Sequence, residues 1–229
     1  MALIDVEKVS RIYNPGLADE MVALDDVSLS IEKGEITVLM GPSGSGKTSL
    51  LSLIGCMARP TAGKILVEEK DIVKLPEHFL TNIRRKRFGF IFQQFNLIKE
   101  LTLLDNVLLP LYPLKISMRK MEQRAVPILK KLNIEDKKNF KIKQLSGGEQ
   151  QRAAIARSLI NEPEIIIADE PTAHLDRKLA QEFLEILVLL KQDGKTIVIA
   201  THDSFIHDNP LINKTIVMRD GKIERVVKK

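Results

Sequence analysis

A run of glycines and serines that ends in lysine and threonine constrains this chain more than any other feature. The stretch Gly41-Pro-Ser-Gly-Ser-Gly-Lys47-Thr48 fits the pattern G-x-x-x-x-G-K-[ST]. Glycines there let successive backbone N–H groups converge on phosphate oxygens without a Cβ in the way. The apolar run Glu35–Met40 precedes the stretch, and Lys47–Met57 follows it with leucines at helical spacing. Strand, turn and helix in this order predict an anion site at a helix N-terminus.

The side chains of this loop have distinct predicted roles. Lys47 can reach the β- and γ-phosphates of a nucleotide, and the Thr48 hydroxyl can ligate Mg²⁺. An ordinary glycine-rich turn is the alternative, which the flanking strand and helix make the weaker interpretation. We expect the phosphates to be surrounded by Gly41, Pro42, Ser43, Gly44, Ser45, Gly46, Lys47, Thr48 and Ser49.

A pair of acids closes an apolar strand further along the chain. Ile165-Ile-Ile-Ala-Asp169-Glu170 reads as a strand buried on both faces that ends in two carboxylates. A carboxylate is costly to bury unless it is paired or bound to a metal. We therefore expect Asp169 to hold Mg²⁺ and Glu170, which points differently, to polarise an attacking water. Two solvated surface acids are the alternative, which is weakened by the phosphate loop.

A third motif, Leu145-Ser-Gly-Gly-Glu149-Gln150, leads into a helix. The Ser146 hydroxyl and the amides of Gly147 and Gly148 can point at a phosphate, and an N-capped helix with a flexible lead-in is the alternative. The motif, Glu149 included, resembles the signature of ATP-binding cassette (ABC) proteins. With the two motifs above, the resemblance extends over essentially the whole chain.

The resemblance assigns roles to two residues that follow strands. Gln93 comes after the expected strand Phe88–Phe92 and matches the family's glutamine that contacts Mg²⁺ and water and senses the partner. His202 comes after Thr196–Thr201 and matches the histidine that contacts the γ-phosphate. ABC similarity therefore implies four catalytic residues, Glu170, His202, Gln93 and Lys47, and three metal ligands, Thr48, Gln93 and Asp169.

Two further matches concern nucleotide contacts. Tyr13 matches the aromatic residue that stacks on adenine in the family. Asp176 ends Ala173-His174-Leu175-Asp176, which matches the D-loop with an unusual histidine, whose role stays open. The implied cofactors are ATP and Mg²⁺.

The resemblance also implies an α/β P-loop NTPase fold. It comprises a RecA-like core with a mainly parallel sheet, an antiparallel β region on the N-terminal side and an inserted α-helical subdomain. We expect a single nucleotide-binding domain over 1–229, with the core and β region at 1–92 and 162–229 and the helical subdomain at 93–161. Alternation of strand-like and helix-like segments supports an α/β class independently.

Apolar periodicity locates the expected elements. Strands are predicted at Leu3–Val9, Val27–Ile31, Lys64–Val67, Glu164–Ala168 and Thr196–Ala200, helices at Met118–Leu132, Glu149–Leu159 and Leu179–Lys191, and a terminal hairpin at Ile216–Met218 and Ile223–Val227.

The family's mechanism implies two partners. Two copies of the chain would form a head-to-tail homodimer around two ATP molecules, so that Lys47 of one copy and Ser146 of the other touch one nucleotide. The chain would drive a separate membrane permease for export, extraction or mechanotransmission. Three stretches, Ile83–Phe92, Gln93–Leu97 and Leu101–Leu111, resemble the lipoprotein-releasing and macrolide-efflux (LolD/MacB) branch. The alternatives are an importer ATPase of the amino-acid type, a soluble ABC ATPase acting on nucleic acid or ribosomes, and a nonhydrolysing module.

Charge and composition narrow these alternatives. The net charge is +5 and the basic run Arg84–Arg87 is short, while aromatic residues make up only 4% of the chain. Without a stacking pattern we expect no nucleic-acid partner, and we interpret the run as a solvated helix end or as a surface facing the permease or lipid headgroups.

The single cysteine, Cys56, favours the cytosol. No uncharged stretch approaches the roughly 20 residues of a membrane span, so we expect a cytoplasmic protein held at the inner face by the permease.

Overall fold

The computed structural model describes residues 2–173 and 176–228, so His174 lies outside the described residues. The strands are β1 (Ala2–Tyr13), β2 (Met21–Glu32), β3 (Ile36–Met40), β4 (Ala62–Val67), β5 (Lys70–Asp71), β6 (Phe88–Ile91), β7 (Ile165–Asp169), β8 (Thr196–Thr201), β9 (Lys214–Arg219) and β10 (Lys222–Lys228). The α-helices are α1 (Lys47–Ile54), α2 (Glu77–Arg87), α3 (Leu103–Leu108), α4 (Met118–Lys131), α5 (Gly147–Leu159), α6 (Arg177–Gln192) and α7 (Ser204–His207), with 3₁₀ turns η1 (Leu109–Leu114), η2 (Glu135–Lys137) and η3 (Ile142–Gln144).

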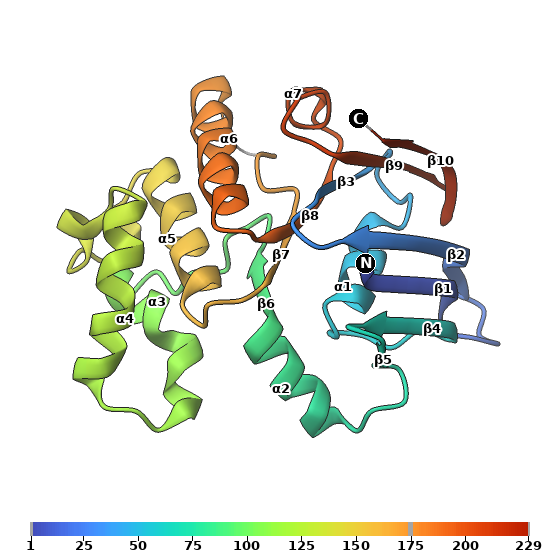
Figure 1. Ribbon diagram of the computed structural model, residues 1–229, viewed down its shortest axis with the longest axis horizontal. Helices are drawn as coiled ribbons and strands as arrows, with labels where there is room; N and C mark the ends of the chain where they lie inside the picture. The colour runs from blue at the N-terminus through green and yellow to red at the C-terminus, as the bar shows by residue number, and fades with distance from the viewer. Residues whose placement is uncertain (1, 174–175, 229) are drawn as a thin grey trace.

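Two sheets organise the chain (Figure 1). The larger has the strand order β10-β9-β3-β8-β7-β6, in which every neighbouring pair except β10 and β9 is parallel. The smaller, β2-β1-β4-β5, is antiparallel. A mainly parallel sheet beside an N-terminal antiparallel one confirms the predicted α/β P-loop fold class.

The larger sheet positions the candidate site. Because β3, β7 and β8 run parallel, the segments that follow their carboxyl ends meet at one edge. The glycine-rich loop follows β3, Glu170 follows β7 and His202 follows β8. Residues 165–168 and 196–201 are buried throughout, as their continuous apolar character predicts for strands covered on both faces.

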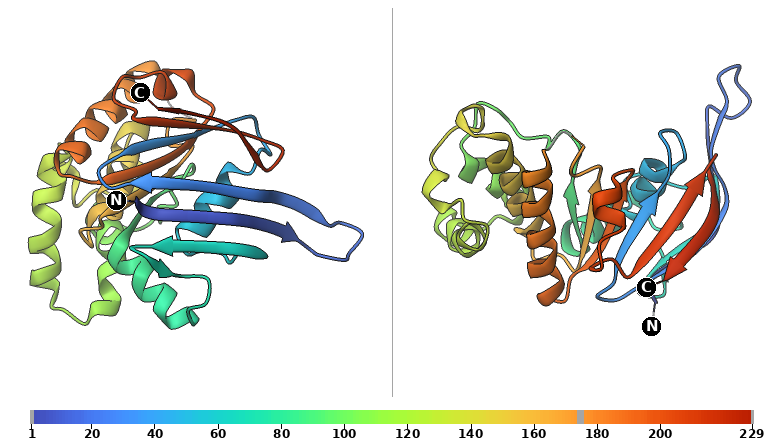
Figure 2. Two further views of the ribbon diagram at one scale, coloured as in Figure 1. Left: turned by 45° about the vertical axis from the view of Figure 1, so that its right-hand side comes forward. Right: turned by 90° about the horizontal axis from the view of Figure 1, so that it is seen from above.

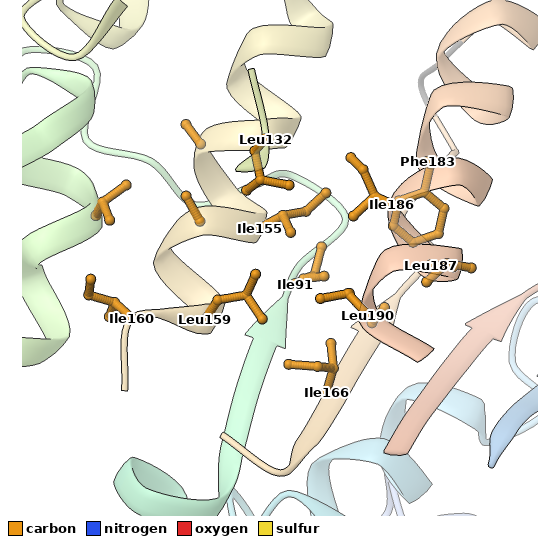
Figure 3. Packing of buried hydrophobic residues seen from close by; sticks show 14 of the residues in the cluster. Ile91, Leu132, Ile155, Leu159, Ile160, Ile166, Phe183, Ile186, Leu187 and Leu190 are labelled. Carbon is orange, nitrogen blue, oxygen red and sulfur yellow. The ribbon is translucent and has the colours of Figure 1, made fainter. Parts of the chain in front are cut away.

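Helices cover the larger sheet on both sides. Figure 1 shows α3, α4 and α5 gathered beyond β6, with α6 between them and the sheet. Figure 3 shows Ile155 and Leu159 of α5 facing Phe183 and Leu190 of α6, with Ile91 of β6 close by. A second apolar cluster joins α1 to strands of both sheets through Leu50, Leu53 and their neighbours. The domain boundaries expected from the sequence stay a prediction.

Helix α1 is shorter than its periodicity suggests. The predicted helix ran to Met57, but α1 ends at Ile54. The Gly55 amide caps it by donating to the Leu51 carbonyl, and Cys56 turns the backbone into the left-handed region at φ 60°. Met57 then donates to the Ser52 carbonyl. The helix prediction was therefore wrong at this end, because leucine spacing does not report a backbone reversal.

Two arginines of the basic run Arg84–Arg87 form hydrogen bonds and ion pairs with neighbouring residues. It closes α2, where Arg84 donates to the Cys56 carbonyl at 2.6 Å and pairs with Glu77 at 2.7 Å. Arg87 pairs with Glu164 at 3.0 Å and Glu68 at 2.6 Å. These contacts join α2 to neighbouring segments, while the Arg87 side chain stays 42% exposed, so the run is a partly solvated helix end whose arginines form ion pairs.

Candidate active site

A cavity of about 510 Å³ opens at the carboxyl edge of the larger sheet. It brings together side chains that follow three different strands and the loop after a fourth, as the sequence motifs predicted. The lining residues are Met21, Val22, Ala23, Pro42, Ser43, Gly44, Ser45, Gly46, Lys47, Thr48, Ser49, Gln93, Glu170 and His202. A site of this composition is polar, open and built around a helix N-terminus.

Two glycines of the loop are required by close backbone approaches. A Cβ on Gly41 would lie 2.2 Å from the Met218 carbonyl oxygen, and one on Gly46 would lie 2.6 Å from that of Ala23. Gly46 also has φ 97° and caps the N-terminus of α1. Any side chain at these positions would push the loop off β9 and β2, so the glycines set the shape of the anion cradle.

Lys47 is the buried cation of the cavity. Its side chain is only 7% exposed, and Nζ donates to the carbonyls of Gly41 at 2.7 Å and Pro42 at 2.9 Å. Nζ also lies 3.9 Å from Glu170 Oε1. The ammonium group is therefore held by its own loop, over the space that the loop amides surround.

Thr48 and Asp169 form the part of the site that fits a hard cation. The Thr48 hydroxyl donates to Asp169 Oδ1 at 3.1 Å. Burial raises the pKa of the Asp169 carboxyl, against the opposing effect of the Thr48 hydrogen bond. A carboxylate that is costly to charge in this place is suited to a bound Mg²⁺, which favours oxygen ligands and keeps waters and phosphates as the others. Among residues 2–173 and 176–228, no group of three or more His, Cys, Asp and Glu could hold a metal.

Because the pKa of Asp169 is raised, its negative charge should lower the free energy of unfolding of the nucleotide-free protein. The folded state then binds more protons than the unfolded state between the two pKa values, and stability falls as pH rises through that window. We expect Asp169→Asn to raise the melting temperature at pH 7.5 by about 2–4 °C, which is roughly 1 kcal/mol in a chain of this size. The gain should shrink near pH 4.

The control for this prediction is Glu122→Gln, which removes a carboxylate from an exposed position on α4. Its melting temperature should equal that of the parent protein at both pH values. A lower melting temperature for Asp169→Asn than for this control at pH 7.5 would contradict the prediction.

Glu170 and His202 lie together at the mouth of the cavity. His202 Nδ1 is 3.0 Å from Glu170 Oε1, and the imidazole is 67% exposed whereas Glu170 is 14% exposed. The Glu170 backbone is left-handed at φ 45°, a strained conformation for a non-glycine residue, and its amide donates to the Ala200 carbonyl at 2.8 Å. Glu170 Oε2 is buried with no hydrogen-bond partner among the described residues. That oxygen is a free hydrogen-bond acceptor in the cavity lining, as is the Ser45 hydroxyl oxygen.

The glycine-rich motif at the start of α5 does not line this cavity. Ser146 caps α5, with its hydroxyl donating to Glu149 Oε2 at 2.9 Å and its amide donating to the same oxygen at 2.8 Å. These bonds lower the pKa of Glu149, the backbone bond most. Gly147 has open space where a Cβ would stand, whereas a Cβ on Gly148 would meet Leu179 at 2.5 Å. Within one chain the motif is a capped helix end that does not line the cavity of the glycine-rich loop.

Tyr13 and Asp176 also lie outside the cavity lining. Tyr13 ends β1, where the Arg11 guanidinium stacks on its ring at 4.5 Å. The hairpin of β1 and β2 reaches away from the rest of the chain (Figure 2). Asp176 caps α6 by accepting from the Leu179 amide at 2.9 Å. The adenine role of Tyr13 and the nucleotide role of Asp176 stay predictions.

Sequence reasoning missed residues that shape the site without belonging to a motif. Met21, Val22 and Ala23 of β2 form one wall of the cavity. Gln151, which is 2% exposed, donates to the Pro171 carbonyl at 3.0 Å, directly after Glu170. Thr172 donates to Asp203, next to His202, at 3.1 Å. None of these contacts has a local sequence signal, because each joins segments distant in the chain.

Comparison with known proteins gives a consistent result. Residues 24–173 match the family model described as ABC transporter. MJ0796 of Methanocaldococcus jannaschii, named an ABC transporter ATP-binding protein, is 44% identical over 97% of this chain and 96% of its own length. The macrolide export ATP-binding/permease protein MacB of Aggregatibacter actinomycetemcomitans is 40% identical over 97% of this chain, which spans 34% of the MacB length.

Two solved structures of MJ0796 resemble the chain throughout. A dimeric structure of this ABC transporter cassette has a TM-score of 0.89 at 42% identity and covers 98% of both chains. A second dimeric structure, in a post-hydrolysis state with ADP and Pi, has a TM-score of 0.88.

Proposed function

This chain belongs to the ABC transporter family as an ATP-binding ATPase domain, and we propose that it drives a separate membrane permease by ATP-dependent head-to-tail dimerisation. The observation that carries the proposal is the convergence of Lys47, Glu170 and His202 at the carboxyl ends of three adjacent parallel strands. Nucleotide hydrolysis needs a positive charge to bind phosphate and a free carboxylate oxygen to accept a proton from water. Here a histidine lies beside that carboxylate.

The residues divide the chemistry as follows. Lys47 leaves its loop carbonyls for the β- and γ-phosphates, and the loop amides bind the remaining oxygens. Thr48 and Asp169 would hold Mg²⁺ with Gln93, and the ion when bound neutralises charge on the phosphates. Glu170 Oε2 accepts the proton of the attacking water, while His202 orients the carboxylate through Oε1.

A second copy of the chain completes the proposed site. Ser146, Gly147 and Gly148 begin a helix that does not line the cavity of their own chain, and helix N-termini favour phosphate. In a head-to-tail pair they would contact the ATP held by Lys47 of the partner copy, and Asp176 would approach the same interface. The dimeric structures of the MJ0796 cassette support this arrangement.

A groove on another face fits a permease segment. Its volume is about 470 Å³, and aromatic and proline side chains line it between β6, η1 and the end of α5. Phe88, Phe90 and Phe92 stack along it with ring centroids about 6 Å apart, beside Arg84 and Arg85. MacB, which carries ATP-binding and permease functions under one name, supports a permease as the occupant and export as the mode.

None of the helices in the described ranges is long and apolar enough to cross a membrane, and we propose a cytoplasmic position held by the permease.

Capture from native membranes tests the partner. The bait is Glu170→Gln with saturating ATP and Mg²⁺, with bound proteins identified by mass spectrometry. A second bait adds Phe92→Asp in the groove, and a matched one adds Phe140→Asp, whose ring is 43% exposed elsewhere.

The proposal predicts that the permease is recovered by the first and third baits and lost from the second. A multi-span importer permease would replace export by import. Ribosomes or nucleic acid without a membrane protein would overturn the transport function.

A further inference from the structure

The segment that carries Gln93 is a tight turn with a strained backbone. Gln93 begins the turn of residues 93–96 that follows β6, and its side chain lines the candidate active site. Phe95 and Asn96, two and three residues later, both adopt left-handed conformations, with φ 58° and 50°. Two consecutive non-glycine residues in this region are costly and persist only where surrounding contacts hold them.

Arg157, in the last turn of α5, makes the contacts that hold this turn. Its guanidinium donates to the Phe95 carbonyl at 2.5 Å and to the Asn96 carbonyl at 2.5 Å. Burial lowers the pKa of Arg157. Two carbonyl dipoles on a planar fork fix both the position and the orientation of the turn, which a lysine could not reproduce.

Asn106 of α3 anchors the same segment further along. Its side chain is fully buried, accepts from the Ile98 amide at 2.7 Å and donates to the Ile98 carbonyl at 3.0 Å. The turn is thus tied to helices on its downstream side and continues from β6 on its upstream side. Displacement of α5 relative to the sheet must therefore change the place of Gln93.

We propose that Arg157 is a positioning residue for ATP hydrolysis, which sets the location of Gln93 through the Phe95 and Asn96 carbonyls. The inference rests on the proposed function and adds to it a link within one chain. The helix capped by Ser146, where the partner's ATP would bind, carries Arg157 in its last turn, and Arg157 holds the turn that bears Gln93. Arg157 also lines the groove proposed for the permease, so it lies between that groove and Gln93.

Steady-state ATPase measurements on Arg157→Met, alone and combined with Gln93→Ala, test this role. We expect Arg157→Met to lower kcat by about 10–100-fold, as a displaced catalytic group does, with KM for ATP changed less than about threefold. Arg157→Lys should fall between it and the parent. In the Gln93→Ala background, Arg157→Met should lower kcat by less than about threefold more, because its effect acts through the missing glutamine.

Arg59→Met is the matched control. Arg59 also donates to two nearby carbonyls, of Val73 and Leu75, but that segment carries no residue of the candidate site. It should change the melting temperature without changing kcat in either background.

Several results would overturn the role of Arg157. The first is an unchanged kcat in Arg157→Met. The second is an equally large loss of kcat when Arg157→Met is added to Gln93→Ala. The third is an unchanged kcat in Gln93→Ala itself. Absence of Mg²⁺-dependent ATPase activity in the parent protein would instead count against the proposed function.

Discussion

Glu170→Gln should slow steady-state ATP hydrolysis by about 10²–10⁴-fold, the contribution of a general base, while ATP binding survives. Glu170 Oε2 is buried without a partner among the described residues, and the carboxylate points between Lys47 and His202. Glutamine keeps the shape of the side chain but cannot take a proton from water. ATP binding is carried by Lys47 and the loop amides, which the substitution leaves in place.

The control for this prediction is Glu185→Gln, which removes an exposed carboxylate from α6. Single-turnover hydrolysis and equilibrium binding of a fluorescent ATP analogue separate the two effects. Unchanged turnover in Glu170→Gln would remove Glu170 from the role of base, and a parallel loss of binding would indicate damage to the phosphate loop.

Lys47→Ala should weaken ATP binding by about 1.5–3 kcal/mol, the range for hydrogen bonds to charged groups, or roughly ten- to a hundredfold in Kd. Lys47 is the buried ammonium of the cavity, and the loss removes a charge-assisted contact to phosphate. It also leaves the Gly41 and Pro42 carbonyls without their donor in the nucleotide-free state. We therefore expect a lower melting temperature without nucleotide as well as weaker binding.

Titration calorimetry with ATP and Mg²⁺ measures this effect. Lys120→Ala, at an exposed position on α4, removes a lysine of the same charge and should bind ATP as the parent does. Equal affinity in Lys47→Ala and Lys120→Ala would contradict the assignment of the phosphate loop.

Local patterns predicted the elements whose burial is simple. The runs before Asp169 and before His202 are buried on both faces, and a continuous apolar stretch is the sequence pattern typical of such strands. Helix α4 buries Met121, Ala125 and Leu129 at four-residue intervals, so its period identified it. Glycine spacing predicted the loop between β3 and α1, where Gly41 and Gly46 lie too close to other backbone to carry a side chain.

Features that depend on contacts between distant segments have no local sequence pattern that predicts them. The β2 wall of the cavity, beginning at Met21, depends on where a long hairpin packs. The contacts of Gln151 and Arg157 join α5 to loops that are 20 and about 60 residues away. Early termination of α1 depends on a left-handed Cys56, a residue with no special preference for that region.

If ATP joins two copies of the chain through a shared site, the mass of Glu170→Gln in solution must depend on ATP. Light scattering after size-exclusion chromatography should give a monomer without nucleotide and a dimer with saturating ATP and Mg²⁺. Adding Ser146→Arg, which places a bulky cation at the start of α5, should keep the protein monomeric under the same conditions. A Glu170→Gln protein that binds ATP and stays monomeric would show that ATP does not join two copies through a shared site.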